Sequence, residues 1–371
     1  MKLGADSLPD LSRGAVFLAT GGGGDPYVSF LIALHALEEH GPVDLLDPEE
    51  LDDDAYVVAI GSVGAPTVSL ELLPSRVDAV QTLDAFESHV GRKVDAVISF
   101  EIGGGNSLIP LVAAAGRGVP VIDGDGMGRA LPEAQMMTYP ICGVRPTPAI
   151  GRDYAGNIVT FSTPSIVDYE RQVRKFALEN GGMITAAEHP MSGRQVKNSV
   201  VPRTVTFSVE IGKILNKYRG DAKRIFKPLS QAFADSIYGD LKHLYTGNVV
   251  DCTSKIIGGF DIGEATIESF DKSMPPMTIN IKNEYLLARI GGQIAASVPD
   301  LITIVDYETS TPINAERLRY GQRVTVFGVG CPSCYRTADA LAVVEPRCFG
   351  FDIDYVPIEE LDTIATSLKS E

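Results

Sequence analysis

The first half of the chain alternates short β-branched runs with segments of helical periodicity. This alternation is typical of an α/β domain with a mostly parallel sheet. The apolar runs predict strands at Ala15–Ala19, Val43–Leu46, Tyr56–Ile60, Ala96–Phe100 and Pro120–Ile122. Amphipathic spacing predicts helices at Tyr27–Glu39, Ser75–Ser88 and Ser107–Gly116. We therefore expect an α/β domain over residues 1–165.

The pattern changes after residue 150. A polar turn at Ala155-Gly156-Asn157 predicts a hairpin, and helical spacing follows within residues 167–236. Residues 244–330 form consecutive short strand patterns separated by glycine turns, which is typical of a β-rich, barrel-like domain. We therefore expect a carboxyl-terminal domain over residues 166–371, helical over 167–236 and β-rich over 244–356.

Glycine-rich loops directly follow four of the predicted strands of the first domain. They occupy residues 20–26, 61–66, 101–107 and 123–129. Because ligands bind outside the carboxyl ends of parallel strands, we expect the four loops to line one pocket. The first loop is a weak match to a phosphate-binding loop, since no Lys-Ser/Thr pair follows and Pro26 replaces the third fingerprint glycine. The alternative, a helix capped by Asp25 after a tight turn, explains that aspartate fully but not the four glycines before it.

Carboxylates at the ends of these strands are the best candidates for acid–base chemistry. Like charges brought together raise at least one pKa, which places a general acid beside a general base. The same groups could hold a hard divalent cation, or each could simply cap a loop. Arg129 could pair with one of them or bind a substrate carboxylate. The predicted catalytic set is Asp25, Glu101, Asp123 and Asp125.

Charge and composition exclude several classes of protein. The net charge is −16, from 48 acidic and 32 basic side chains, which disfavours nucleic acids and anionic membranes as partners. The amino terminus lacks the apolar core of a signal peptide, and no apolar run is long enough to span a bilayer. We expect a cytoplasmic protein with mostly reduced thiols, since five cysteines are an odd number.

Cys331-Pro332-Ser333-Cys334 is the one local thiol motif. At a turn or helix start, the pKa of the first thiol could fall enough to make it a nucleophile. Two structural thiols are the alternative, because one such motif cannot complete a structural zinc site. The five histidines show no metal-ligand spacing. Cys331 and Cys334 therefore form a second candidate site.

Longer motifs resemble those of the S-methyl thiohydantoin desulfurase family, which is often encoded beside hydantoinase-type enzymes. The resemblance covers nearly the whole chain and implies an α/β domain followed by a β-rich domain. It is carried by residues 21–26, 101–106, 123–133, 283–284, 298–302, 319–321 and 346–352.

The resemblance implies hydrolytic removal of sulfur from C2 of a five-membered thiohydantoin ring. That reaction needs proton transfers and stabilisation of a tetrahedral adduct, and it needs no nucleotide cofactor. A divalent metal is possible but no ligand spacing supports it. Asn283, Glu284 and Asp300 interrupt strand-like runs, so we expect them to face a cleft between the domains. The predicted substrate-binding residues are Gly22, Gly23, Gly24, Asn106, Arg129, Glu133, Asn283 and Glu284.

Three functional hypotheses follow for a small-molecule substrate. The first is a hydrolase with carboxylate acid–base residues, and the second is thiol catalysis at Cys331 or Cys334. The third is a non-catalytic binding subunit that partners a hydantoinase-like enzyme. We expect a homo-oligomer in each case.

Overall fold

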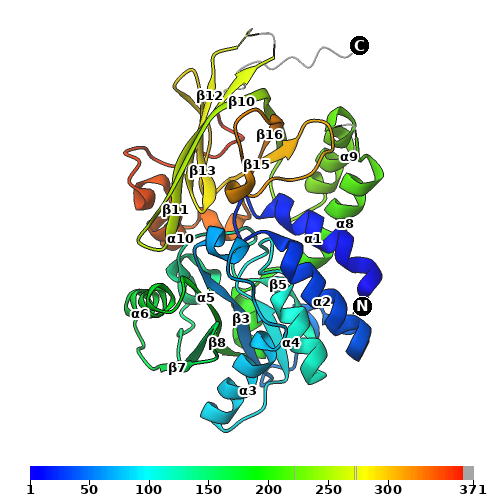
Figure 1. The fold of residues 1–371 in the computed structure, drawn as a ribbon, viewed down its shortest axis with the longest axis vertical. Coiled ribbons are helices and arrows are strands. Elements are labelled where there is room, and N and C mark those ends of the chain that lie inside the picture. The colour runs from blue at the N-terminus through cyan, green and yellow to red at the C-terminus, as the bar shows by residue number, and fades with distance from the viewer. Residues whose placement is uncertain (221, 271, 273, 362–371) are drawn as a thin grey trace.

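The computed structural model describes residues 1–361 except 221, 271 and 273. These residues form two domains, an α/β domain with a mixed sheet and a second domain with a curled antiparallel sheet (Figure 1). The predicted fold class is therefore confirmed. Within the described residues, no helix is long and apolar enough to cross a membrane.

The first sheet has a parallel centre and antiparallel edges. Strands β2, β5, β4 and β3 run parallel, in that order, and α-helices lie in the crossovers from β3 to β4 and from β4 to β5. Strand β8 pairs antiparallel with β3 and with β6, so it lies inside the sheet. The strands are β1 (Lys2–Leu3), β2 (Val43–Leu46), β3 (Tyr56–Gly64), β4 (Ala96–Ser99), β5 (Val121–Asp125), β6 (Ala149–Asp153), β7 (Ile158–Phe161), β8 (Met183–Ser192) and β9 (Val201–Pro202).

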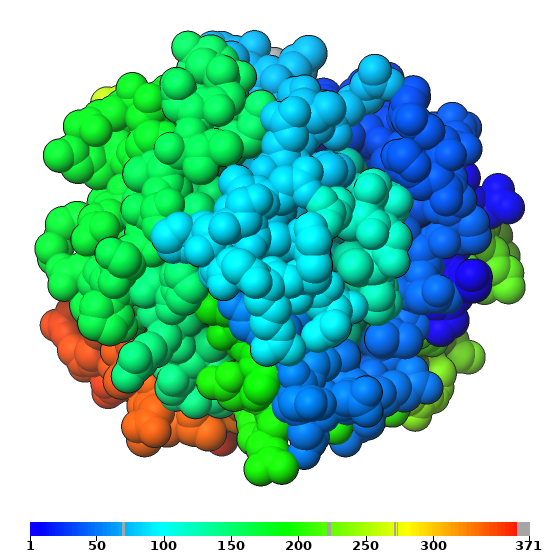
Figure 2. All heavy atoms as spheres, turned by 90° about the horizontal axis from the view of Figure 1, so that it is seen from below, coloured from blue at the N-terminus to red at the C-terminus, as the bar shows by residue number. Residues whose placement is uncertain are grey.

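Helices cover this sheet. In Figure 1, α2 and α4 lie on one flank of the sheet and α5 and α6 on the other. Viewed from below, the surface consists mainly of segments from the first 200 residues, with an orange carboxyl-terminal segment at its edge (Figure 2). The helices are α1 (Leu8–Leu18), α2 (Pro26–His40), α3 (Asp78–Val90), α4 (Ile109–Arg117), α5 (Thr138–Ile141), α6 (Ile166–Glu179), α7 (Gly193–Ser199), α8 (Thr204–Lys217), α9 (Ala222–Ala234) and α10 (Ala338–Val344).

The second sheet is antiparallel throughout and curls into a half-barrel, as the glycine-punctuated strand pattern predicts. Its concave face packs an apolar core of its own, which includes Ile267, Ile279 and Val326. The strands, in sequence order, are β10 (Leu241–Ile257), β11 (Phe260–Ser269), β12 (Met277–Lys282), β13 (Glu284–Ile290), β14 (Gln293–Ser297), β15 (Leu301–Asp306) and β16 (Arg323–Val329).

One predicted strand is wrong, because Ala15–Ala19 ends helix α1 and is not a strand. Helix α1 is buried along most of its length, and a helix buried on most sides carries the same continuous apolar run as a buried strand. Its close packing against α8 depends on glycine. A Cβ at Gly14 would lie 1.8 Å from the backbone oxygen of Ser208. The first glycine loop therefore joins two helices.

The segment after residue 165 contributes to both domains. Strand β8 completes the first sheet and α8 packs on α1, whereas the second sheet begins at Leu241. Helical spacing predicts α6, α8 and α9 well, but β8 was not predicted. Residues 362–371 of the predicted second domain lie outside the described part of the chain.

Candidate active site between the two domains

All four glycine-rich loops reach one cavity of about 190 Å³, as predicted. The second domain closes the cavity from the opposite side through the turn between β12 and β13. The predicted position of the pocket between the domains is therefore confirmed. The loop residues in the wall are Gly23, Gly24, Asp25, Ser62, Val63, Gly64, Pro66, Glu101, Gly105, Asn106 and Met127, and they face Asn283 and Glu284.

Contact between the backbones of two loops explains their glycines. A Cβ at Gly23 would lie 2.4 Å from Cα of Gly103, and a Cβ at Gly104 would lie 1.9 Å from the backbone oxygen of Gly24. The backbone oxygen of Gly23 accepts a hydrogen bond from the amide of Gly105 at 2.8 Å. Since side chains would separate the loops, the glycines are needed for the loops to pack together.

Glu101 follows β4 and lies in the cavity wall, where it is nearly fully buried. The Asn106 Nδ2 atom donates to Glu101 Oε1 at 2.8 Å, and the Leu131 amide donates to Oε2 at 3.3 Å. Burial raises the pKa of Glu101 to about 7, against the opposing effect of these two hydrogen bonds. Glu101 can therefore exchange a proton near neutral pH.

Glu284 enters the same cavity from the second domain. It follows Asn283, which has a left-handed φ of 60° and whose Oδ1 accepts from the Asp261 amide at 2.8 Å. A Cβ at Gly22 would lie 2.2 Å from Glu284 Oε1, so the first loop must be bare of side chains there. Burial, reinforced by the negative charge of Glu101, raises the pKa of Glu284 well above its usual range. Glu284 therefore holds its proton more tightly than an exposed carboxyl group does.

The other three predicted catalytic carboxylates have structural partners. Asp25 lines the cavity, but it caps α2 by accepting from the Tyr27 amide and pairs with Arg317 Nε at 2.5 Å. Asp123 lies outside the cavity wall and accepts from the amide and hydroxyl of Thr206. Asp125, also outside the wall, accepts from the amides of the loop that follows it. Of the four predicted catalytic carboxylates, Glu101 and Asp25 therefore line the cavity, whereas Asp123 and Asp125 do not.

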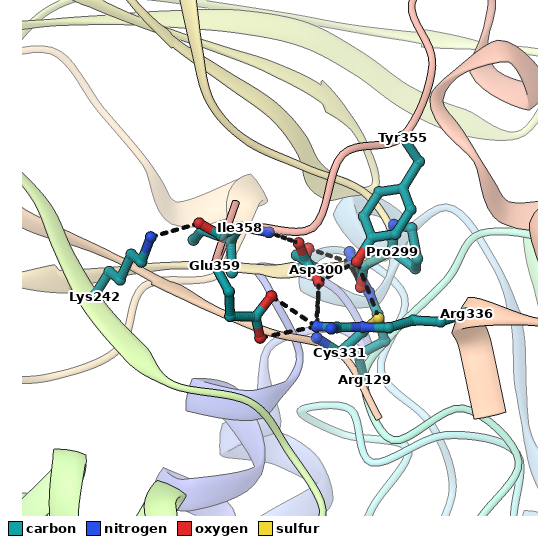
Figure 3. Close-up of polar contacts among 9 residues, drawn as sticks. All are labelled: Arg129, Lys242, Pro299, Asp300, Cys331, Arg336, Tyr355, Ile358 and Glu359. Carbon is teal, nitrogen blue, oxygen red and sulfur yellow. Dashed lines mark hydrogen bonds and ion pairs between the residues drawn. The ribbon is translucent and has the colours of Figure 1, made fainter. Parts of the chain in front are cut away.

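The predicted contact of Arg129 with substrate is not seen, because its side chain is fully buried outside the cavity wall. Glu133 lies in the wall and forms an ion pair with Lys282 that links the two domains. Burial alone would raise the pKa of Glu133, but the ammonium group of Lys282 holds it below its usual value. Asp300 does not face the cleft, since its carboxylate accepts from the Cys331 and Ile358 amides within the second domain (Figure 3).

Sequence reasoning missed a group of charged residues in the far wall of the cavity. Glu170 pairs with Arg174 Nε at 2.5 Å, and Arg174 also donates to the backbone oxygen of Pro132 at 2.8 Å. Glu188 accepts from the hydroxyl group of Tyr169 and belongs to the undetected strand β8. For Glu188 the available signal was a charged residue in an otherwise apolar run, as it was for Glu284.

Neither thiol of the Cys331 motif lines the cavity. Cys331 is buried beside Tyr355, and burial raises its pKa to about 12 (Figure 3). Desolvation of the Sγ atom also raises the pKa of Cys334, to about 11. Within the described ranges, no three His, Cys, Asp or Glu side chains form a group that could hold a metal ion.

Two family models together cover most of the chain. The S-Me-THD-like N-terminal domain matches residues 6–163, and the S-Me-THD-like C-terminal domain matches residues 164–358. The chain belongs to the S-Me-THD-like family. The resemblance to the S-methyl thiohydantoin desulfurase family is thereby confirmed, and the family boundary falls within two residues of the predicted domain boundary.

A solved structure supports the fold of this S-Me-THD-like protein. It is similar to an X-ray crystal structure of a protein from Chromobacterium violaceum, with a TM-score of 0.80 and 22% sequence identity. The alignment covers 96% of this chain and 100% of that chain, so the two proteins share the whole two-domain fold. No curated protein matches the sequence.

Proposed function

We propose that this S-Me-THD-like protein hydrolyses the C2–S bond of an S-methyl thiohydantoin, giving a hydantoin and methanethiol. The observation that carries the proposal is the pair of buried carboxyl groups, Glu101 and Glu284, which approach one cavity from different domains. Burial raises the pKa of both groups, and their surroundings differ, since Glu101 accepts two hydrogen bonds while the negative charge of Glu101 acts on Glu284. Two carboxyl groups in different environments are the arrangement that supplies an acid and a base.

The reaction has two steps, addition of water and loss of methanethiol. Glu101 and Glu284 each transfer one proton in each step. Ionised Glu101 takes a proton from water as the water oxygen bonds to C2, while Glu284 donates its proton to the ring nitrogen. The C2–S bond of the adduct then breaks as the hydroxyl group becomes the C2 carbonyl. The hydroxyl proton returns to Glu284, and protonated Glu101 gives its proton to the departing methanethiolate. One water is consumed, and both carboxyl groups return to their starting states.

The rest of the cavity suits a small uncharged ring. Its wall includes the apolar side chains of Phe100, Ile109, Leu131 and Met137, which exclude water and strengthen electrostatic interactions with the reacting atoms. The backbones of Gly23 and Gly24 approach the cavity without side chains between them and a ligand.

The decisive experiment is turnover by the purified chain alone. We expect S-methyl thiohydantoin to be converted to hydantoin with stoichiometric release of methanethiol, and the compound to raise the melting temperature. Chromatography would measure the hydantoin and a thiol reagent the methanethiol. A raised melting temperature without any turnover would favour the binding-subunit hypothesis. The absence of both would contradict the proposed substrate.

Alkylation of the free thiols should leave the turnover rate nearly unchanged. Thiols with pKa values of about 12 and 11 are almost wholly protonated at neutral pH, so Cys331 and Cys334 are poor nucleophiles. The measurement is activity after treatment with iodoacetamide, with Cys334→Ser as the matched variant because Cys334 is exposed. Loss of activity in both samples would restore the thiol hypothesis.

A further inference from the structure

Arg129 is a fully buried cation whose hydrogen bonds all go to uncharged oxygens. The guanidinium donates to the backbone oxygens of Pro299 at 2.9 Å and Asp300 at 2.8 Å (Figure 3). It also donates to the Thr20 hydroxyl at 2.7 Å and to the Tyr285 backbone oxygen at 3.5 Å. These partners come from the first glycine loop and from the second domain, and Tyr285 directly follows Glu284.

Arg129 forms no ion pair with any carboxylate in the described part of the chain, unlike the two other cations near the site. Lys282 is paired with Glu133, and Arg174 with Glu170. Each of those two positive charges is therefore largely offset by its own partner. Arg129 retains a positive charge that acts on more distant groups in a region of low dielectric constant.

The negative charges close to Arg129 are few. Asp300 is a candidate counter-ion, but its carboxylate already accepts from Tyr355 Oη at 2.8 Å and lies 3.6 Å from Arg336. Asp125 accepts from the backbone amides that follow it. Cys331 and Tyr335 are neutral at pH 7, since burial raises the pKa of each. The remaining carboxyl groups beside Arg129 are Glu284 and Glu101. Glu284 directly precedes Tyr285, whose backbone oxygen accepts from Arg129, and Glu101 Oε2 accepts from the amide of Leu131, two residues after Arg129.

We propose that Arg129 is a positioning residue that keeps one negative charge on the Glu101 and Glu284 pair at neutral pH. Two buried carboxyl groups without a cation would both take up protons, because burial penalises the charged form of each. One buried cation offsets one negative charge. With Arg129 present, one carboxyl group of the pair is an acid and the other a base. Without the cation, both groups would be protonated and both would be acids. The effect of Arg129 on catalysis rests on the proposed function, but its effect on the protonation of the two carboxyl groups does not.

Infrared titration of the free protein tests, without substrate, whether Arg129 controls the protonation of Glu101. The protonated-carboxyl signal of Glu101 is assigned by its loss in Glu101→Gln, and its midpoint is followed in Arg129→Met and Arg129→Lys. We expect Arg129→Met to increase the proton affinity of Glu101 at least tenfold, which is one pKa unit. Arg129→Lys, which keeps the charge, should restore most of the wild-type midpoint. Thr20→Val, which removes one acceptor but leaves the cation, should not move it.

The pH dependence of kcat/KM gives the second readout. Activity should rise with pH as Glu101 ionises, and this rise should move upward by the same one unit or more in Arg129→Met. If Arg129→Met does not fold, Arg129→Gln replaces it, since glutamine retains amide donors for the same acceptors. An unchanged Glu101 titration in folded Arg129→Met or Arg129→Gln would overturn the proposal. Failure of both of these uncharged variants to fold, while Arg129→Lys folds, would overturn it as well. A shifted titration in a protein that releases no methanethiol would instead contradict the proposed function alone.

Discussion

Replacement of Glu101 by glutamine is expected to lower kcat/KM for S-methyl thiohydantoin by about 10²- to 10³-fold, with little loss of stability. Glutamine retains an acceptor for Asn106 Nδ2, so the loop should keep its shape, but it cannot take a proton from water. General acid–base groups typically contribute factors of this size. Steady-state kinetics would measure the loss, and circular dichroism and the melting temperature would establish that the variant folds.

Asp123→Asn is the matched control, because it removes a buried carboxylate that does not line the cavity. Asp123 accepts hydrogen bonds from Thr206 near the start of α8, so its replacement should lower the melting temperature. Its effect on kcat/KM should stay within about threefold, far below the factor for a general acid or base. Normal turnover by Glu101→Gln together with an inactive Asp123→Asn would show that the acid and base lie at the ends of β5, as the sequence alone had suggested.

Glu316→Gln is expected to stabilise the protein by several kcal/mol at pH 8 and to have little effect at pH 5. Glu316 lies in the short helical segment Ala315–Arg317 and is almost fully buried. Burial, with the nearby charge of Asp25, raises its pKa from 4.5 to about 8. Between these two pKa values the Glu316 carboxyl group is ionised in the unfolded chain but protonated in the folded protein. The free energy of unfolding therefore falls as pH rises from about 5 to 8. Glutamine does not titrate and escapes this fall.

Urea unfolding at pH 5 and pH 8 would measure the effect. Glu38→Gln is the control, because Glu38 is exposed on α2 and should show no pH-dependent difference from wild type. An equal change for Glu316→Gln at both pH values would mean that the carboxyl group is ionised in the folded protein.

Local signals in the sequence were sufficient for most elements of the fold. The strand prediction Val43–Leu46 agrees with β2 at both ends, and the helix predicted at Tyr27–Glu39 agrees with α2 to within one residue. Both have clear boundaries, since Asp25-Pro26 starts α2 and Gly41 ends it. Periodicity could not distinguish α1 from a strand. It also missed β8, because Glu188 and His189 interrupt the apolar pattern that would have marked a buried strand.

The candidate site was only partly predictable for a related reason. The four loops were recognisable because a high density of glycine weakens a fold and is therefore typical of loops that approach a ligand or another backbone closely. Glu101 was identified as part of one of these loops. Which carboxylate works with Glu101 depends on contacts between residues far apart in sequence. Asp123 and Asp125 are nearer to Glu101 in sequence, but their carboxylates accept hydrogen bonds from backbone amides and a hydroxyl group instead. Glu284 comes from the other domain, and no local pattern shows that it meets Gly22.

The position of β8 inside the first sheet affects how the chain folds during synthesis. Strand β6 reaches the sheet only through β8, so the hairpin of β6 and β7 has no place to dock until residues 183–192 have been made. Until then β3 also presents an open edge, which is a site where partly made chains can pair with one another. The first 163 residues correspond to one family model, but they do not contain one complete sheet. A shortened chain ending there would be expected to aggregate, and the ribosome must deliver a further 30 residues or so before the first domain can close.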